Sequence, residues 1–416
     1  MNLTIKPSKV AGTVTAPPSK SYMQRAIALA VLSAGPTEIS NLSDCNDCRA
    51  AVGVARSIGC KVLEADGRLT ITPSANGLNG NHLHCGESGL ALRMFTPIAA
   101  LLGCAVQMTG EGSLTQRPVG FMADTLRQLG ARFECADGLL PITVCGPMKG
   151  GRATVDGSVS SQFLTGLLIS LPTVCADSTL VVDSLTSRPY IDMTLQIMRD
   201  FGVAVENANY EQFTIKGGQQ YHCAHYRVEG DWSGAASLIV AAAIAGDLKI
   251  SGLNPQSAQA DRAILKVLEL TGTQFTFDAD NNLIVNKNAN LHPFRFDATN
   301  CPDLFPVLAA LAANCSGKSA IRGVHRLTHK ESDRATAIQR ELGKLGVGIA
   351  LDGDEMIVSG GPISGGAASA CNDHRMAMSL ALCALNASGA VTIEGTECVG
   401  KSYPGFFDDL ESVIER

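Results

Sequence analysis

Several Lys and Arg side chains of this 416-residue chain stand where an α-helix alone would not favour a positive charge. Each lies at or just inside the start of a predicted helix, where unpaired N–H groups and the helix dipole already create positive potential. Such helix starts are suited to binding anions. An anionic ligand held jointly by N–H groups and cations would account for the pattern. These cations are Lys20, Arg25, Arg93 and Arg375.

The loops beside these helices carry further cations and hydroxyl groups. A solvated surface position is the simpler explanation for any single Lys or Arg, but it weakens when cations recur at equivalent points of a repeat. Serine hydroxyls either cap helices or donate hydrogen bonds to phosphate oxygens. The loop cations are Arg117, Arg188, Lys330, Arg334 and Lys401, and the serines are Ser158, Ser160, Ser161 and Ser187.

Two carboxylates are candidates for acid–base chemistry. Asp303 opens a predicted buried helix in the otherwise uncharged segment NCPDLFP, where a simple N-cap is the alternative. Glu331 follows Lys330, and an ion pair is the alternative there. If the fold brings Asp303 and Glu331 to one site, they would supply the base and the acid of a proton-transfer reaction.

A sixfold repeat of about seventy residues must position these groups. Helix-like stretches end at Gly59, Gly130, Gly202, Gly272 and Gly346, with spacings of 71, 72, 70 and 74 residues. Each copy combines a strand, a polar cluster, a buried helix, a second strand, an amphipathic helix and a hairpin, which predicts an α+β fold with three copies in each of two lobes. The buried helices are expected to begin near Met23, Leu90, Ser161, Ser233, Asp303 and Asp373.

Composition and charge restrict the class of protein. The net charge of −6 argues against general affinity for nucleic acid, which needs a basic surface. No apolar run is long enough to span a membrane, and the N-terminus MNLTIKPSKV has no secretory apolar region, so a cytoplasmic protein is expected. No phosphate-binding loop or dinucleotide fingerprint is present, so no motif indicates ATP or NAD.

The cysteine and histidine patterns favour no metal. Cys45 and Cys48 form a single C-x-x-C among fourteen scattered cysteines, and a zinc site would require a second pair or suitably spaced histidines. We therefore expect this pair to be structural. His325 and His329 are four residues apart, but the H-E-x-x-H pattern of a zinc hydrolase is absent.

Six motifs in order resemble the 5-enolpyruvylshikimate-3-phosphate (EPSP) synthase family of enolpyruvyl transferases, from about residue 5 to residue 410. The resemblance implies an inside-out α/β barrel fold of two lobes, each built of three βαβαββ units. Residues 1–17 and 230–416 would form one lobe and residues 18–229 the other. The active site would lie in the cleft between them. The motifs are SKSYMQR, VDGSVSSQFLTGLL, SRPYIDMTL, KESDR, NDHRMAM and GKSYPGFF.

The resemblance also implies the reaction and its partners. The 5-hydroxyl of shikimate 3-phosphate adds to C2 of phosphoenolpyruvate, and the tetrahedral adduct then loses inorganic phosphate. Both substrates carry a carboxylate and a phosphate, which would explain many cations in an acidic protein. No metal or organic cofactor, nucleic acid or membrane is expected, and family members suggest a monomer.

Site residues are carried over by matching position. Asp303 would accept the 5-hydroxyl proton, and Glu331 with Lys20 would handle protons at the methylene carbon. His374 and Arg93 would flank the site. The phosphoenolpyruvate contacts would be Lys20, Gly89, Arg117, Gln162, Arg334, Arg375 and Lys401. The shikimate 3-phosphate contacts would be Ser21, Arg25, Ser160, Ser161, Gln162, Ser187, Tyr190, Asp303 and Lys330.

The chain departs from the family pattern at three points. Glu87 and Leu90 replace the usual amide and hydroxyl of the segment before Arg93, and Arg326 stands where Asn is frequent. The nearest alternative is the sister enzyme UDP-N-acetylglucosamine 1-carboxyvinyltransferase, but its loop cysteine has no counterpart between Val106 and Glu134. A repeat protein that only binds anions is a third hypothesis, disfavoured because the candidate acid–base residues are all present.

Overall fold

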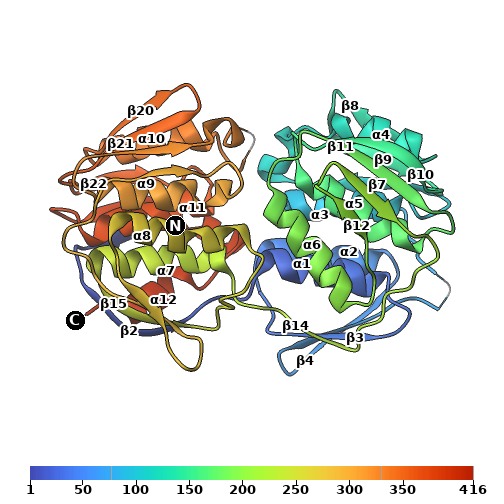
Figure 1. Ribbon diagram of the computed structural model, residues 1–416, viewed down its shortest axis with the longest axis horizontal. Coiled ribbons are helices and arrows are strands. Elements are labelled where there is room, and N and C mark those ends of the chain that lie inside the picture. The colour runs from blue at the N-terminus through green and yellow to red at the C-terminus, as the bar shows by residue number, and fades with distance from the viewer. Residues whose placement is uncertain (76, 329, 416) are drawn as a thin grey trace. The chain divides into compact units, whose positions relative to one another are not determined.

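One arrangement of strands and helices recurs along the chain, and residues 82–145 show it completely (Figure 1). Two strands separated by a helix pair in parallel, and a second helix leads into a hairpin that extends the same sheet, in the order β6-β7-β9-β8. The elements are β6 (His82–His84), α3 (Gly89–Ala99), β7 (Ala105–Thr109), α4 (Ala123–Gln128), β8 (Arg132–Ala136) and β9 (Leu139–Cys145).

The computed structural model describes residues 1–75, 77–328 and 330–415, and these form two compact units. Unit 2 is the continuous segment Lys20–Val228, and unit 1 combines Met1–Ser19 with Glu229–Arg416. Each unit contains three copies of the repeat, so the predicted α+β fold is confirmed.

In unit 2, the first copy takes its opening strand from the end of the segment: β14 pairs in parallel with β3. Its elements are α1 (Lys20–Val31), β3 (Thr37–Ser40), α2 (Asn46–Ser57), β4 (Lys61–Ala65), β5 (Arg68–Thr72) and β14 (His225–Arg227). The third copy comprises β10 (Gly151–Asp156), α5 (Ser161–Ser170), β11 (Ser178–Asp183), α6 (Arg188–Asp200), β12 (Glu206–Ala208) and β13 (Gln212–Ile215).

In unit 1, the N-terminal strands complete two sheets: β2 pairs in parallel with β15, and β1 is antiparallel to β23. The first copy has β2 (Val10–Thr15), α7 (Trp232–Ala245), β15 (Gly246–Ser251), α8 (Ile264–Thr271), β16 (Phe275–Phe277) and β17 (Leu283–Val285). The second has β18 (Arg295–Asp297), α9 (Phe305–Ala313), β19 (Lys318–Arg322), α10 (Arg334–Lys344), β20 (Gly348–Asp352) and β21 (Glu355–Ser359). The third has β22 (Gly366–Ser369), α11 (His374–Leu385), β23 (Val391–Glu394), α12 (Phe406–Ser412) and β1 (Asn2–Ile5).

One helix of each copy is buried nearly all round, as the sequence predicted. In unit 1, α7, α9 and α11 pack against one another, and in unit 2, α3 packs against α1 and α5. Helix α1 begins at Lys20, three residues before the predicted start, so Lys20 is its first residue. The repeat glycines end the amphipathic helices with positive φ, the left-handed conformation that a helix C-terminus favours (Gly59, Gly130, Gly202, Gly272 and Gly346).

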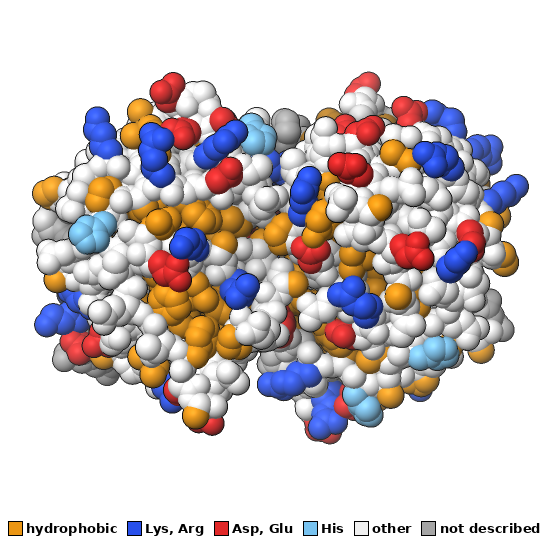
Figure 2. Space-filling model, in the orientation of Figure 1, with side chains coloured by type: hydrophobic (Ala, Val, Ile, Leu, Met, Phe, Trp, Pro, Cys, Tyr) orange, Lys and Arg blue, Asp and Glu red, His pale blue; other side chains and the backbone are white. Residues whose placement is uncertain are grey.

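Charge is mixed over the surface. The face drawn in Figure 2 shows Lys and Arg interspersed with Asp and Glu, without the continuous basic stripe that nucleic-acid binding uses. Within the described residues, no helix combines the length and apolar character needed to cross a membrane.

Candidate active site

Three helix starts meet around Asp303 in unit 1. Asp303 lies in the short 3-10 helix η5 (Pro302–Leu304) that precedes α9, and its carboxylate faces cations from the loop before α10, from α10 itself and from α11. Asp303 Oδ1 accepts hydrogen bonds from Arg334 Nη1 at 2.8 Å and Lys330 Nζ at 3.3 Å, and Oδ2 accepts one from Arg375 Nη2 at 3.2 Å. The N-cap alternative for Asp303 is wrong, because neither η5 nor α9 has a side-chain cap.

Arg334 is the centre of this cluster. Its side chain is 1% exposed and bridges three carboxylates, with Nε 2.7 Å from Asp373 Oδ2 and Nη2 2.5 Å from Glu331 Oε2 besides the bond to Asp303. Burial opposes the charge of Arg334, but Asp373, Glu331 and Asp303 outweigh it and raise the pKa of the guanidinium well above its ordinary value. The cation is therefore fixed in place before any ligand binds.

Asp373 was not among the predicted site residues, although the sequence carries a signal for its role as a helix cap. It caps α11 by accepting a hydrogen bond from the Arg375 backbone N–H at 3.0 Å. Asp231 caps α7 at the corresponding point of another copy. Asp373 could therefore have been predicted as a helix cap, because it stands in a polar cluster just before a buried helix. Its ion pair with Arg334 could not have been predicted from the sequence.

Lys330 and Lys401 are held more loosely. Burial lowers the pKa of the Lys330 ammonium, although Asp303 and Glu331 partly offset this effect. A quarter of the Lys330 side chain remains exposed. Lys401 is buried and donates a hydrogen bond from Nζ to the Asn372 carbonyl at 3.1 Å. Both ammonium groups thus lie beside α11 or Asp303, where an anion could replace their present partners.

A buried carboxyl group lies behind Arg375. Ser233 Oγ accepts a hydrogen bond from Arg375 Nη2 at 3.1 Å and donates one to Asp261 Oδ2. The other oxygen of Asp261 is buried, and no described residue hydrogen-bonds to it. Burial raises the pKa of Asp261 to about 7, helped by the charges of Asp303 and Asp231 and opposed by Arg375 and Lys330.

We expect this carboxyl group to make stability depend on pH. Between its ordinary pKa of 3.8 and the folded value of about 7, the folded chain binds more protons than the unfolded chain, so the free energy of unfolding falls as pH rises. Asp261→Asn cannot ionise, so its stability relative to the parent should increase from pH 5 to pH 8, by up to about 3 kcal/mol. Urea unfolding at both pH values tests this, and parallel pH profiles for the two proteins would exclude the effect.

In unit 2, Gly89 allows two guanidinium groups to approach one helix start. A β-carbon at Gly89 would lie 3.0 Å from Arg117 Nη1, 3.2 Å from Arg93 Nη1 and 3.6 Å from Gln162 Oε1. Arg93 Nη1 donates a hydrogen bond to Gln162 Oε1 at 2.9 Å, and this contact joins α3 to α5. Because Gly89 has no side chain, its backbone N–H remains accessible beside Arg93, Arg117 and Gln162, as the binding of an anion requires.

The predicted serine positions surround the starts of α5 and α6. Ser160 caps α5 through the Gln162 N–H at 3.2 Å, and Ser161 is the first helical residue. Ser187 is buried with φ of 58° just before α6. Ser158 instead bonds to Asp156 at 2.6 Å. The capping interpretation thus holds for Ser160.

Arg25 lies deeper than a surface cation. Its side chain is buried, with Nη1 2.9 Å from the Ser21 carbonyl, Nη2 3.2 Å from the Tyr190 carbonyl and Nε 2.9 Å from Thr194 Oγ1. Burial lowers the pKa of Arg25 to about 10, which leaves it charged at neutral pH. The structure therefore brings Arg25 together with Ser21 and Tyr190.

Lys20 is paired with a carboxylate that the sequence reasoning missed. Lys20 Nζ lies 3.0 Å from Asp47 Oδ2, and both side chains are mostly buried. Asp47 lies in the first turn of α2, between Cys45 and Cys48. The surface explanation fails for most of the predicted cations, because Arg25, Arg93, Arg117, Arg334, Arg375 and Lys401 are buried.

The departure at Glu87 has a local explanation. Glu87 Oε2 accepts hydrogen bonds from the Ser113 backbone N–H at 3.2 Å and from Ser113 Oγ at 3.4 Å. Ser113 Oγ in turn accepts one from Arg117 Nη2 at 3.4 Å. The carboxylate therefore fastens the 3-10 helix η1 (Gly112–Gln116), which leads directly to Arg117.

The histidines have different surroundings. His325 bonds through Nδ1 to Asp354 Oδ1 at 2.6 Å, while His329 lies outside the described residues. His374 is buried at the start of α11, 4.0 Å from Asp373. Among the described residues, no group of three His, Cys, Asp or Glu side chains could hold a metal ion.

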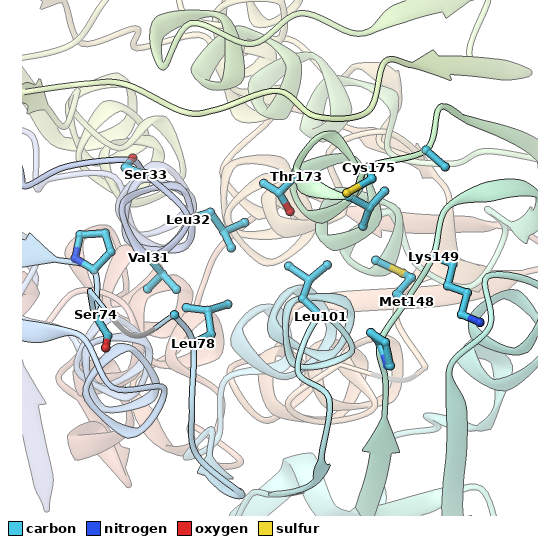
Figure 3. Close-up of a pocket in the computed structure, with 15 residues that line it drawn as sticks. Val31, Leu32, Ser33, Ser74, Leu78, Leu101, Met148, Lys149, Thr173 and Cys175 are labelled. Carbon is cyan, nitrogen blue, oxygen red and sulfur yellow. The ribbon is translucent and has the colours of Figure 1, made fainter.

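A pocket of about 610 Å³ lies at the opposite end of the buried helices of unit 2 (Figure 3). It is lined mainly by apolar side chains that follow the C-termini of α1, α3 and α5, including Leu32, Leu101 and Val174. None of the predicted site residues lines it. The cations and serines instead gather at the N-termini of these helices, so this pocket is separate from the candidate site.

Comparison with known proteins agrees with this geometry. The family model for EPSP synthase (3-phosphoshikimate 1-carboxyvinyltransferase) matches residues 5–410. The chain belongs to the EPSP synthase family. Curated 3-phosphoshikimate 1-carboxyvinyltransferases from Clostridium kluyveri and Methanocorpusculum labreanum are each 37% identical, over 99% of this chain and 97% and 98% of theirs.

Solved structures share the fold. An EPSP synthase from Acinetobacter baumannii has a TM-score of 0.84 and 25% identity, and the match covers 99% of this chain and 98% of that chain. The enolpyruvyl transferase NikO from Streptomyces tendae has a TM-score of 0.80 at 19% identity, which supports the fold alone. The predicted family is confirmed, and the UDP-N-acetylglucosamine alternative is not favoured.

Proposed function

We propose that this chain transfers the enolpyruvyl group of phosphoenolpyruvate to the 5-hydroxyl of shikimate 3-phosphate, in the shikimate pathway to chorismate and the aromatic amino acids. The hydroxyl oxygen bonds to C2 of phosphoenolpyruvate, while its proton passes to Asp303 and C3 gains a proton. The tetrahedral adduct then loses inorganic phosphate and one proton of the C3 methyl group, which restores the double bond. Every atom of the reaction comes from the two substrates, and we propose that no cofactor takes part.

The observation that carries this proposal is the carboxylate of Asp303 in contact with three cations. Arg334, Lys330 and Arg375 all lie within 3.3 Å of it. A carboxylate beside fixed cations can accept a proton at the point where anionic substrates are held. Glu331, bonded to the same Arg334, is suited to proton exchange at C3 together with Lys20.

The remaining contacts follow the family match and the charge of each substrate. We propose that phosphoenolpyruvate is bound by Lys20, the Gly89 backbone, Arg117, Gln162, Arg334, Arg375 and Lys401. We propose that shikimate 3-phosphate is bound by Ser21, Arg25, Ser160, Ser161, Gln162, Ser187, Tyr190, Asp303 and Lys330. Arg93 and His374 would support these sets, since Arg93 orients Gln162 and His374 precedes Arg375.

Phosphate release tests the assignment directly. The purified chain is incubated with phosphoenolpyruvate plus either shikimate 3-phosphate or UDP-N-acetylglucosamine, and inorganic phosphate is measured. We expect release only with shikimate 3-phosphate, unaffected by a chelator. Absence of release with that substrate would overturn the proposal, and release with UDP-N-acetylglucosamine alone would replace it by the sister activity. We further propose that the protein is cytoplasmic and that it is a monomer. Sedimentation with both substrates present would test the oligomeric state.

We expect Glu87→Ala to weaken phosphoenolpyruvate binding. The substitution frees Ser113 and the segment before Arg117, so KM for phosphoenolpyruvate should rise about three- to tenfold, the effect of losing one or two hydrogen bonds. KM for shikimate 3-phosphate should change little. Glu87→Gln keeps an acceptor and should stay close to the parent.

A matched control for this prediction is Glu111→Ala, which removes an exposed carboxylate from the same loop. It should leave both KM values unchanged. An equal rise of KM for both substrates in Glu87→Ala would indicate a general loss of structure and would contradict a specific role in placing Arg117.

A further inference from the structure

The first turn of α2 places two thiols next to Lys20. Cys45 is the N-cap residue of α2, and its carbonyl accepts hydrogen bonds from the Cys48 and Arg49 N–H groups, each at 3.0 Å. Residues three apart in such a turn are neighbours on the helix surface, which places the two thiols on the same side of the α2 start. No other two cysteines of the chain are this close in sequence.

This pair is connected to Lys20 in two ways. Cys48 Sγ donates a hydrogen bond to the Lys20 backbone carbonyl at 3.7 Å. Asp47, which lies between the two cysteines in sequence, holds Lys20 Nζ at 3.0 Å. A covalent bond between the two sulfur atoms would therefore remove the first contact and shift the residue that makes the second.

We propose that Cys45 and Cys48 form a redox site, in which a hydroperoxide oxidises the two thiols to a disulfide and thereby displaces Lys20. The sulfur of Cys45 attacks one peroxide oxygen, the O–O bond breaks, and a sulfenic acid and water (or an alcohol) form. The sulfur of Cys48 then attacks the Cys45 sulfur, and hydroxide leaves and takes up the Cys48 proton as a second water. Two thiols are oxidised, and one peroxide is reduced.

The surroundings suit this chemistry. Cys45 is the N-cap residue of α2, and the N-terminus of a helix favours the thiolate form of a cysteine. Burial raises the pKa of Cys48 well above its ordinary value, and its thiol donates to the Lys20 carbonyl, so Cys45 is the attacking thiol and Cys48 the resolving one. Both thiols are buried, but the adjacent side chains of Asp44 and Arg49 are 78% and 65% exposed, so the pair lies just beneath the surface. A small hydroperoxide, unlike a protein disulfide, fits this access.

The test combines peptide mass with turnover in the full-length protein. Hydrogen peroxide is applied to a Cys104→Ser/Cys175→Ser background, which removes two exposed thiols that would otherwise react. We expect the peptide with Cys45 and Cys48 to lose the mass of two hydrogen atoms and to resist alkylation until dithiothreitol is added. Phosphate release should fall at least about tenfold, as expected if one contact to the transition state is lost, and should return on reduction.

Cys48→Ser is the matched variant, because its hydroxyl can still donate to the Lys20 carbonyl but cannot form a disulfide. It should keep basal turnover and become insensitive to peroxide. The proposal is overturned if the peptide stays reduced, if the disulfide forms without loss of turnover, or if Cys48→Ser loses activity as the parent does. The measurement of phosphate release rests on the proposed function. Should that function fail, the peptide mass still decides whether the disulfide forms.

Discussion

Asp303→Asn is expected to bind phosphoenolpyruvate and shikimate 3-phosphate but to turn over at least about a hundredfold more slowly than the parent, the usual effect of removing a general base. The amide keeps the shape of the side chain and can still accept a hydrogen bond from Arg334, 2.8 Å away in the parent. It cannot take up the proton of the 5-hydroxyl. The loss should therefore appear in kcat and leave the KM values nearly unchanged.

If Asp303 is the base, as we propose, the cations around it would allow this carboxylate to act only once substrate is bound. In the free chain its charge is shared by Arg334, Lys330 and Arg375. A substrate phosphate or carboxylate that binds these cations draws them away from Asp303, and the carboxylate becomes the stronger acceptor for a proton. In this proposal, binding and proton acceptance are coupled through the same three side chains.

Calorimetric titration of each substrate, together with initial rates of phosphate release, separates these effects. Asp354→Asn is the control, because Asp354 also pairs with a cation and a histidine of unit 1, Arg322 and His325, but is no proposed contact. It should retain parental turnover. Near-normal kcat in Asp303→Asn would remove Asp303 as the base, and loss of binding would assign it a structural role.

The helices and the positions of the cations at helix starts could be predicted from the sequence, because both depend on local patterns. Helices apolar on all sides indicated burial, and the repeat glycines indicated where amphipathic helices end; the structure confirms both. The strands that open the first copy of each unit were harder to assign. β14 pairs with β3, from which it is separated by almost two hundred residues, and a local periodicity in the sequence cannot predict such a pairing.

The carboxylate partners of the cations escaped prediction for the same reason. Asp373 is 39 residues from Arg334, and Asp47 is 27 residues from Lys20. Asp261 is linked to Arg375 through Ser233, a residue that lies 28 positions away from it. A motif reveals which residue types are present, whereas these contacts depend on how three helix starts converge. The partners change the interpretation of the cations, since a guanidinium already held by carboxylates is ordered before an anion arrives.

Arg334→Met is expected to be the most destabilising single substitution in the site. It removes the cation shared by Asp303, Glu331 and Asp373, and leaves Asp373, which is fully buried, without its ion pair to Arg334. Breaking a buried ion pair by removing one partner costs about 3–5 kcal/mol. Urea unfolding should show this loss near pH 7, and phosphate release should fall in parallel.

Arg340→Met on the same helix is the matched control, because its partner Glu341 is buried but Arg340 itself is 56% exposed. Its loss should cost no more than about 1 kcal/mol, because Arg340 is largely exposed and Glu341 keeps its ion pair with Lys344. Arg334→Lys separates charge from geometry. It restores one positive charge but cannot bridge three carboxylates as a guanidinium does, so stability should recover in part while turnover stays low. Full recovery of turnover by Lys would show that only the charge at this position matters, and would contradict the role of the bridging geometry.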